Sequence, residues 1–191
     1  IMSVGVDVSD RTSVENMIEL SHERLGSLDI LICNAGIMDR APFMEMEENF
    51  WDNVLNTNLG GVFRCSQVAA RYMIAGSRGG RIVNVASNSG IFGGRGRAAY
   101  GASKAGLNSL GQSLAKALAK DRVFVYTIAP GFVDTERVKN LIDDEVRAQS
   151  PLNRVAKPQE IADTALWLAT GDNEFLTGCI IDVNGASYLR S

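Results

Sequence analysis

Short apolar runs alternate along this chain with longer segments in which apolar residues recur every three or four positions. The short runs have the continuity of strands that are buried on both faces, whereas the longer segments have the period of helices with one apolar side. We therefore predict the end of a strand at Met2–Val8, and further strands over Leu28–Cys33, Ile82–Ala86, Val123–Ala129 and Cys179–Val183.

The predicted helices lie between these strands. A capping box, Thr12-Ser13-Val14-Glu15, opens the first helix, and Gly26 ends it. Its inward side is expected to carry Val14, Met17, Ile18 and Leu25. The other helices are predicted from about Met46 to Ile74, from Tyr100 to Ala119, and from Pro158 onward. Apolar strands that alternate with amphipathic helices indicate an α/β protein with a parallel sheet covered on both faces.

Small and polar residues follow three of the predicted strands. They are Asn34-Ala35-Gly36, Ser87 and Pro130-Gly131. In open parallel sheets, ligands bind beyond the carboxyl ends of the strands. The sequence therefore predicts one crevice to which all three strand ends contribute.

Candidate chemistry lies just beyond the second of these ends. Tyr100 and Lys104 are four residues apart on a predicted helix, so their side chains share one face. An ammonium beside a phenol favours the phenolate, so Lys104 is expected to lower the pKa of Tyr100. A Gly-rich segment (Gly90, Gly93, Gly94 and Gly96) could fold back and bring the Ser87 hydroxyl beside the phenol. A Tyr-x-x-x-Lys pair also arises by accident in helices, so its surroundings decide its meaning.

Composition narrows the possible functions. The 191 residues, 46% of them hydrophobic, suffice for one core, and the net charge of −3 without a basic stripe argues against a nucleic-acid partner. No apolar run reaches the roughly 20 residues that a membrane span needs, so we expect a cytoplasmic protein.

The cysteines and the single histidine limit the possible chemistry. Cys33, Cys65 and Cys179 suit reduced, packed thiols rather than disulfides or a metal site. His22 is the single histidine, which leaves a Ser-His-Asp hydrolase one candidate base.

The ordered motifs resemble those of the classical short-chain dehydrogenase/reductase family. They are Asp7-Val8, Asn34-Ala35-Gly36, Asn58 in Asn56-Thr57-Asn58-Leu59, Ser87, Tyr100-x-x-x-Lys104 and Pro130-Gly131. The stretch Ile128–Thr135 is most like the 3-oxoacyl-[acyl-carrier-protein] reductases. The resemblance implies a Rossmann-like, doubly wound parallel sheet. It also implies an oxidoreductase that moves a hydride between NAD or NADP and a carbonyl or secondary alcohol.

The resemblance implies roles for individual residues. Tyr100 would exchange a proton with the substrate oxygen, Ser87 would hold that oxygen, and Lys104 would hold the nicotinamide ribose. Asn58 would support a water that relays the proton from Lys104. The implied cofactor-binding residues are Asp7, Val8, Asn34, Ala35, Gly36, Tyr100, Lys104, Pro130, Gly131, Val133 and Thr135.

The resemblance also implies a class of substrate and an oligomeric assembly. The substrate would be a small carbonyl or alcohol compound, with an acyl-carrier-protein thioester the first candidate and a sugar or cyclic alcohol the second. Met38, Phe92 and Phe132 are candidate apolar walls, although each suits a core equally well. A homo-oligomer, either dimer or tetramer, is implied.

One departure from the family pattern concerns the beginning of the sequence. The family opens with a Thr-Gly-x-x-x-Gly-x-Gly turn that binds the cofactor pyrophosphate, and this sequence contains no such segment. We expect residues 1–191 to form a single domain of the family that lacks its first two strand–helix units, on the order of 50 residues. The edge of the Leu28–Cys33 strand would then be exposed. A fragment of a longer enzyme is one explanation, and a truncated, non-catalytic oligomerisation or interaction module is the other.

Overall fold

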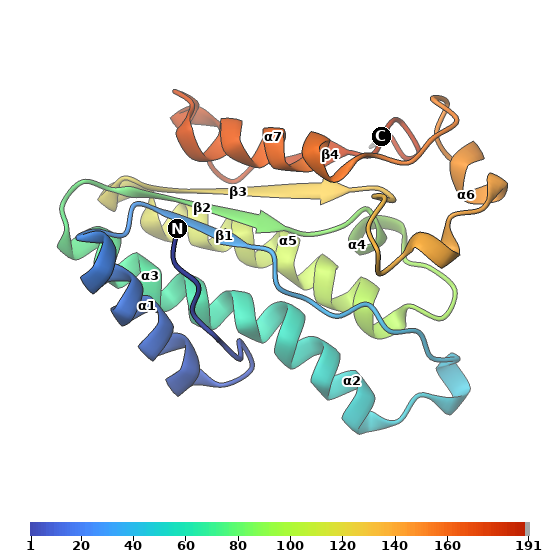
Figure 1. Cartoon of the computed structure of the whole chain (residues 1–191), viewed down its shortest axis with the longest axis horizontal. Coiled ribbons are helices and arrows are strands. Elements are labelled where there is room, and N and C mark those ends of the chain that lie inside the picture. The colour runs from blue at the N-terminus through green and yellow to red at the C-terminus, as the bar shows by residue number, and fades with distance from the viewer. Residues whose placement is uncertain (190–191) are drawn as a thin grey trace.

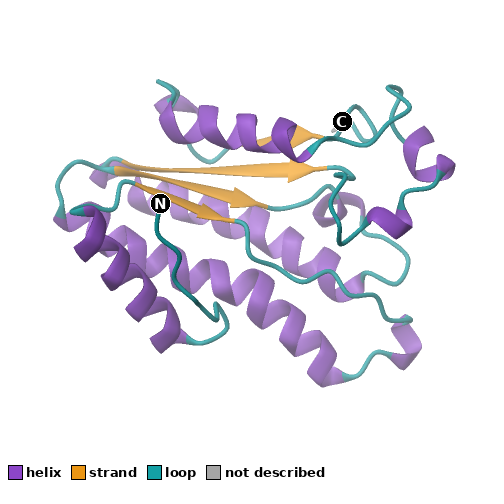
Figure 2. Ribbon diagram, in the orientation of Figure 1, coloured by secondary structure: helices purple, strands orange, loops and turns teal. Residues whose placement is uncertain are grey.

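The computed structural model describes residues 1–189 and is built on a sheet of four parallel strands (Figures 1 and 2). Their order across the sheet is β1-β2-β3-β4, which is also their order along the chain. Their bounds are β1 Ile30–Cys33, β2 Gly80–Val85, β3 Val123–Pro130 and β4 Ile180–Val183. The predicted α/β class with a parallel sheet is confirmed.

Helices cover both faces of the sheet, as predicted (Figure 1). On one face lie α1 Arg11–Leu25, α3 Gly61–Ala75 and α5 Ala98–Leu118, and on the other lies α7 Pro158–Thr170. Successive residues of a strand point to opposite faces, so Ile82 packs with the first group and Val83 with α7. The shorter helices are α2 Glu48–Leu55, α4 Ser89–Phe92 and α6 Asp144–Ala148.

The beginning of the chain differs from the prediction in two ways. Residues 2–8 form no strand, and the capping residue of α1 is Asp10, whose carboxylate accepts a hydrogen bond from the Ser13 amide at 2.6 Å. Asp10 lies one residue before the first helical residue, which is the position that leaves the unpaired amides within its reach. The end of the helix is as predicted, with Gly26 in the left-handed conformation, but Leu25 is 66% exposed rather than inward.

The long helical region predicted from Met46 to Ile74 is interrupted. It consists of α2, a π-helical turn over Asn56–Gly60, and α3. Such turns are frequent at functional sites because they redirect side chains within a helix. Here the turn contains Asn58, whose side chain is fully buried.

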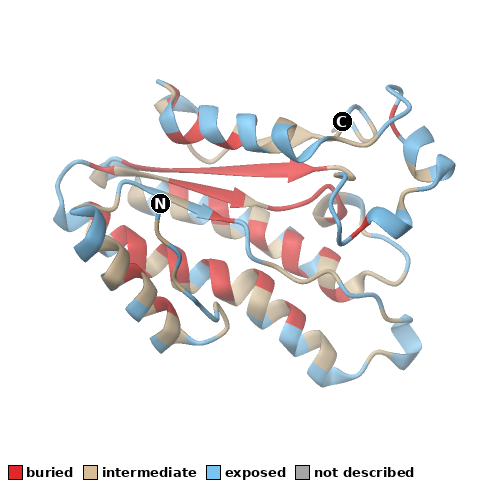
Figure 3. Ribbon diagram, in the orientation of Figure 1, coloured by how far each residue is buried: buried red, intermediate tan, exposed pale blue. Residues whose placement is uncertain are grey.

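Strand β1 lies at an edge of the sheet and has no second neighbouring strand within residues 1–189. Its side chains Ile30 and Ile32 are 42% and 46% exposed, in contrast to the buried β3 (Figure 3). The exposed edge expected from the sequence is therefore present.

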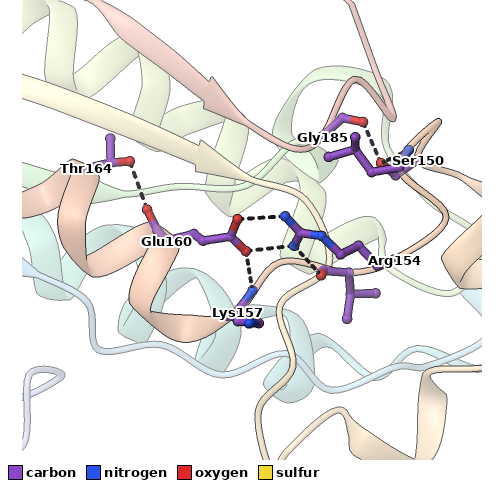
Figure 4. A network of polar contacts seen from close by, with 8 residues as sticks. Ser150, Arg154, Lys157, Glu160, Thr164 and Gly185 are labelled. Atoms are coloured by element: carbon purple, nitrogen blue, oxygen red, sulfur yellow. Dashed lines mark hydrogen bonds and ion pairs between the residues drawn. The ribbon is translucent and has the colours of Figure 1, made fainter.

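A polar network fixes the start of α7 (Figure 4). The two terminal guanidinium nitrogens of Arg154, Nη1 and Nη2, each donate to the Glu160 carboxylate at 2.8 Å, and the Lys157 amide donates to it as well. These hydrogen bonds lower the pKa of Glu160 to about 2. Nearby, the Ser150 hydroxyl donates to the Gly185 carbonyl at 2.5 Å, which ties the segment before α7 to the segment after β4.

Candidate active site

The carboxyl ends of three strands open into one cavity of about 200 Å³, as the sequence predicts. Asn34 follows β1, Ser87 follows β2 and Pro130 ends β3, and all three line the cavity. The strand ends are linked beyond the sheet, because the Asn88 amide donates to the Pro130 carbonyl at 3.0 Å. This link holds the Ser87 loop against the end of β3.

The Gly-rich segment folds back over α5, which places Ser87 and Tyr100 in the same cavity. Helix α4 packs so closely on α5 that a Cβ on Gly90 would lie 2.6 Å from the Lys104 carbonyl carbon. The Ser87 hydroxyl oxygen accepts a hydrogen bond from the Ser89 amide at 3.1 Å, so the first turn of α4 orients it. Glycine at position 90 thus allows the close approach on which the site depends.

The environment of Tyr100 differs from the expectation. Burial raises the pKa of the phenol. A hydrogen bond with the Ser87 hydroxyl and the positive charges of Arg97 and Arg137 lower this pKa, but they offset only part of the rise. Lys104 is not among the groups that shift the pKa of this phenol, although its ammonium nitrogen lies 5.8 Å from the Tyr100 ring centroid. The phenol therefore keeps its proton at neutral pH.

Lys104 is buried in the same helix, with 5% of its surface exposed. Its ammonium donates a hydrogen bond to the Val85 carbonyl, at the end of β2, at 2.8 Å. Burial lowers the pKa of this ammonium to about 8. A group with this pKa can give up its proton close to physiological pH, which is uncommon for a lysine and typical of functional sites.

Asn58 lies behind the cavity rather than in its lining. Its side-chain oxygen accepts from the Ile37 amide at 2.8 Å, and its nitrogen donates to the Ile37 carbonyl at 2.9 Å and to the Ser103 hydroxyl at 3.1 Å. Ser103 in turn donates to the Tyr100 carbonyl at 2.7 Å. The Asn58 side chain therefore joins the loop after β1 to the helix that carries Tyr100. Ile37 and Ser103 were not predicted, since a backbone partner and a helical serine leave no distinctive pattern.

The residues predicted to bind cofactor fall into three groups: those at the main cavity, those at a second cavity, and Asp7, which lines neither. Those that line the main cavity are Asn34, Gly36, Tyr100, Lys104, Pro130, Gly131, Val133 and Thr135. A Cβ on Gly36 would lie 3.1 Å from the Asn58 side-chain oxygen, and one on Gly131 would lie 3.1 Å from Asn184, so a side chain at either position would require the neighbouring asparagine to shift. At the cavity wall, Val133 bridges Ala156 through hydrogen bonds that use neither the N–H nor the C=O of Val133.

A second cavity, of about 150 Å³, adjoins the first at Asn34. Val8 and Ala35 line this second cavity together with apolar side chains of β1 and α3. Asp7 lines neither cavity. Its carboxylate accepts hydrogen bonds from the Ser9 amide at 2.9 Å and the Ser9 hydroxyl at 2.7 Å, and these hydrogen bonds lower the pKa of Asp7.

Two of the three candidate apolar walls are part of the main cavity. Met38 and Phe132 line it, whereas Phe92 lies outside, with its ring 5.0 Å from that of Tyr188. The lining also includes Arg97, which was not among the residues predicted for the site. Its spacing of three residues from Tyr100 is a helical spacing that could have identified it.

Comparison with known proteins agrees with this geometry. A family model described as enoyl-(acyl carrier protein) reductase matches residues 2–186. The chain belongs to the short-chain dehydrogenase/reductase family. It is therefore an NAD(P)-dependent oxidoreductase, and the alternative of a non-catalytic interaction module is not favoured.

Individual relatives in the family are 3-oxoacyl-[acyl-carrier-protein] reductases named FabG. The protein from Thermotoga maritima is 38% identical over 183 residues, which are 94% of this chain and 74% of the relative. The Escherichia coli protein is 37% identical over 187 residues, 96% of this chain and 76% of the relative. The Staphylococcus aureus protein is 38% identical over 190 residues, 98% of this chain and 77% of the relative.

Other features of the structure bear on membrane and metal-binding classes of protein. No helix among the described residues is long and apolar enough to span a membrane. Within residues 1–189, no group of three His, Cys, Asp or Glu side chains is placed to hold a metal ion. The three cysteines are free thiols.

Proposed function

We propose that this oxidoreductase reduces the 3-keto group of an acyl thioester, with NADH or NADPH as the hydride donor and Tyr100 as the proton donor. The observation that supports this most directly is the convergence of Ser87, Tyr100 and Lys104 in a cavity at the strand ends. The similarity to three FabG proteins, named as 3-oxoacyl-[acyl-carrier-protein] reductases, supports the substrate class. An acyl carrier protein is the proposed carrier of the substrate.

The residues of the site divide the work of the reaction. Bound dihydronicotinamide supplies the hydride that reduces the carbonyl carbon. The Ser87 hydroxyl holds the carbonyl oxygen, and Tyr100 transfers its phenolic proton to that oxygen, so the ketone gains one hydride and one proton to become an alcohol. Acid catalysis of this kind typically accelerates a reaction about 10²- to 10⁴-fold.

Lys104 and Asn58 support the proton donor in different ways. Lys104 has a pKa of about 8, so it can return a proton to the phenolate after each turnover. The side chain of Asn58 is occupied by Ile37 and Ser103, so we assign it a positioning role rather than a direct part in a water relay. It holds the loop after β1 at a fixed distance from the helix of Tyr100.

The cavity lining suits the nicotinamide half of the cofactor. Gly36 and Gly131 line the cavity and add no side chain to it. The bridge to Ala156 uses neither the N–H nor the C=O of Val133, and these two groups suit the carboxamide, which carries both a donor and an acceptor. The second cavity, with Val8 and Ala35, suits the adenine because it is apolar. Asp7 does not line this second cavity, and a role for Asp7 is limited to holding Val8 through the turn at Ser9.

The proposed assembly of the protein is a homo-oligomer.

The substitution Tyr100→Phe tests this function. It removes the phenolic oxygen and keeps the ring, so kcat for an acetoacetyl thioester should fall at least about 100-fold while the dissociation constant for NADPH or NADH stays the same. Tyr72→Phe is the matched control, since this tyrosine on α3 packs against His22 and not in the cavity. Turnover by Tyr100→Phe equal to that of the Tyr72→Phe control would refute the proposed proton donor.

A further inference from the structure

The charged side chains that line the main cavity all have the same sign. They are Arg97, Lys104 and Arg137, and no Asp or Glu of the described residues is part of the lining. Two of these cations are used within the protein. Lys104 donates to the Val85 carbonyl at 2.8 Å, and Arg137 donates to the Gly36 carbonyl at 2.7 Å.

Arg97 is different because its guanidinium has no such partner. Its side chain makes no hydrogen bond and no ion pair within residues 1–189, although the residue is partly buried. Its guanidinium carbon lies 5.2 Å from the centroid of the Phe132 ring, another part of the cavity wall. Burial and the nearby Arg40 lower the pKa of Arg97, and its interaction with Tyr100 opposes this change.

The position of Arg97 is fixed by the helix that carries Tyr100. Arg97 is the N-cap residue of α5, and its carbonyl accepts a hydrogen bond from the Gly101 amide at 2.7 Å. Stacking on Phe132 restrains the side chain further, because a guanidinium is attracted to the face of an aromatic ring. A guanidinium has five N–H donors, and leaving them unpaired in a partly buried position costs free energy. A ligand oxygen that accepts a hydrogen bond from Arg97 would remove part of this cost.

We propose that Arg97 determines substrate specificity by binding the second oxygen function of a 3-oxo substrate, the thioester carbonyl or the carboxylate of a free 3-oxo acid. This inference rests on the proposed function, in which Tyr100 binds the keto oxygen. The two oxygens of a 3-oxoacyl group are separated by three carbon atoms and so occupy neighbouring positions. Arg97 and Arg137 both act electrostatically on the Tyr100 phenol, and Arg137 donates to the Gly36 carbonyl, so Arg97 is the guanidinium placed to meet the second oxygen.

The test compares three substrates that share a ketone. They are the acetoacetyl thioester of N-acetylcysteamine, acetoacetate, and 2-pentanone, which has no second oxygen. We would measure kcat/KM for each with the wild type, Arg97→Met, Arg97→Gln and the control Arg95→Met. Arg95 is exposed and does not line the cavity, so it controls for the loss of a positive charge from the same loop.

In Arg97→Met, the ratio of kcat/KM for the thioester to that for 2-pentanone should fall about 10- to 100-fold, because a hydrogen bond from a charged donor is lost. The ratio for acetoacetate should fall at least as far. Arg97→Gln keeps a donor without the charge, so it should restore much of the ratio for the thioester but not for acetoacetate. Arg95→Met should resemble the wild type.

Equal losses on all three substrates, or no loss on any, would overturn the inference. A rise in the KM for NADPH or NADH with unchanged substrate ratios would also overturn it, because Arg97 would then bind the cofactor. If the wild type reduced none of the three, the proposed function would fail separately. The side-chain ¹H–¹⁵N signal of Arg97 would then decide: a shift with acetoacetate but not with 2-pentanone supports the subsite, and no shift refutes it.

Discussion

Replacing Lys104 by methionine should change how the stability of the protein depends on pH. Lys104 is 5% exposed, and burial lowers the pKa of its ammonium from 10.5 to about 8. The folded protein therefore releases this proton at a lower pH than the unfolded chain does. Stability then rises with pH between about 8 and 10.5, because the unfolded state binds more protons there.

The size of the effect follows from the difference between the two pKa values. That difference corresponds to about 3 kcal/mol by which the folded state disfavours the charged lysine. Below pH 8 the folded protein bears this cost in full, and above pH 10.5 it bears none. Methionine bears no such cost at any pH, but it leaves the Val85 carbonyl without its donor, which costs about 1–3 kcal/mol at every pH.

The assay is urea denaturation followed by circular dichroism, at intervals from pH 7 to pH 10.5 and with the thiols kept reduced. The free energy of unfolding of the wild type should gain about 3 kcal/mol on that of Lys104→Met across this range. Lys116→Met provides the control, since Lys116 is an exposed lysine on the same helix. Its curve should run parallel to that of the wild type.

Parallel curves for the wild type and Lys104→Met would show that Lys104 titrates alike in the folded and unfolded states, which would refute the reasoning. It would also remove the basis for assigning Lys104 the return of a proton near neutral pH. A gain that appears between pH 5 and 7 instead would place the titration on another group.

Two further predictions concern packing and the network at α7. Gly90→Ala should lower the free energy of unfolding by about 1–3 kcal/mol relative to Gly94→Ala, because its Cβ meets helix backbone at 2.6 Å whereas that of Gly94 meets only a flexible side chain; equal denaturation midpoints would contradict this. Arg154→Met should raise the pKa of Glu160 from about 2 toward its usual value, as measured by NMR titration, and the stabilisation that the wild type loses as the pH falls from 4.5 toward 2 should shrink; an unchanged Glu160 pKa would contradict this.

The sequence predicted the sheet better than it predicted the ends of the chain's elements. Continuous apolar runs such as Val123–Pro130 admit few other readings, because strands buried on both faces have this pattern. The segment Met2–Val8 has a similar look but forms no strand, since strand formation requires a partner that local sequence cannot reveal. The start of the first helix was also not decided by local sequence. Asp10 and Thr12 are both residue types that cap helices well, and the structure uses Asp10.

The site shows what sequence spacing can and cannot establish. The order of strand ends correctly predicted that Asn34, Ser87 and Pro130 meet in one cavity. Spacing could not establish the electrostatics, because burial and hydrogen bonding depend on the whole fold. The expected lowering of the Tyr100 pKa by Lys104 was wrong for this reason: burial dominates, and the cations that oppose it are Arg97 and Arg137.

The two shifted pKa values favour one direction of the reaction near neutral pH. Reduction of a ketone needs a phenol that carries its proton, and burial raises the pKa of Tyr100, so the protonated form prevails. Oxidation of an alcohol needs the phenolate, which this environment disfavours. Lys104, with a pKa of about 8, remains mostly protonated at pH 7 and can resupply Tyr100 after each transfer. Burial of the two side chains is the largest cause of both shifts. The burial of Tyr100 and Lys104 therefore favours the protonation states that carbonyl reduction requires.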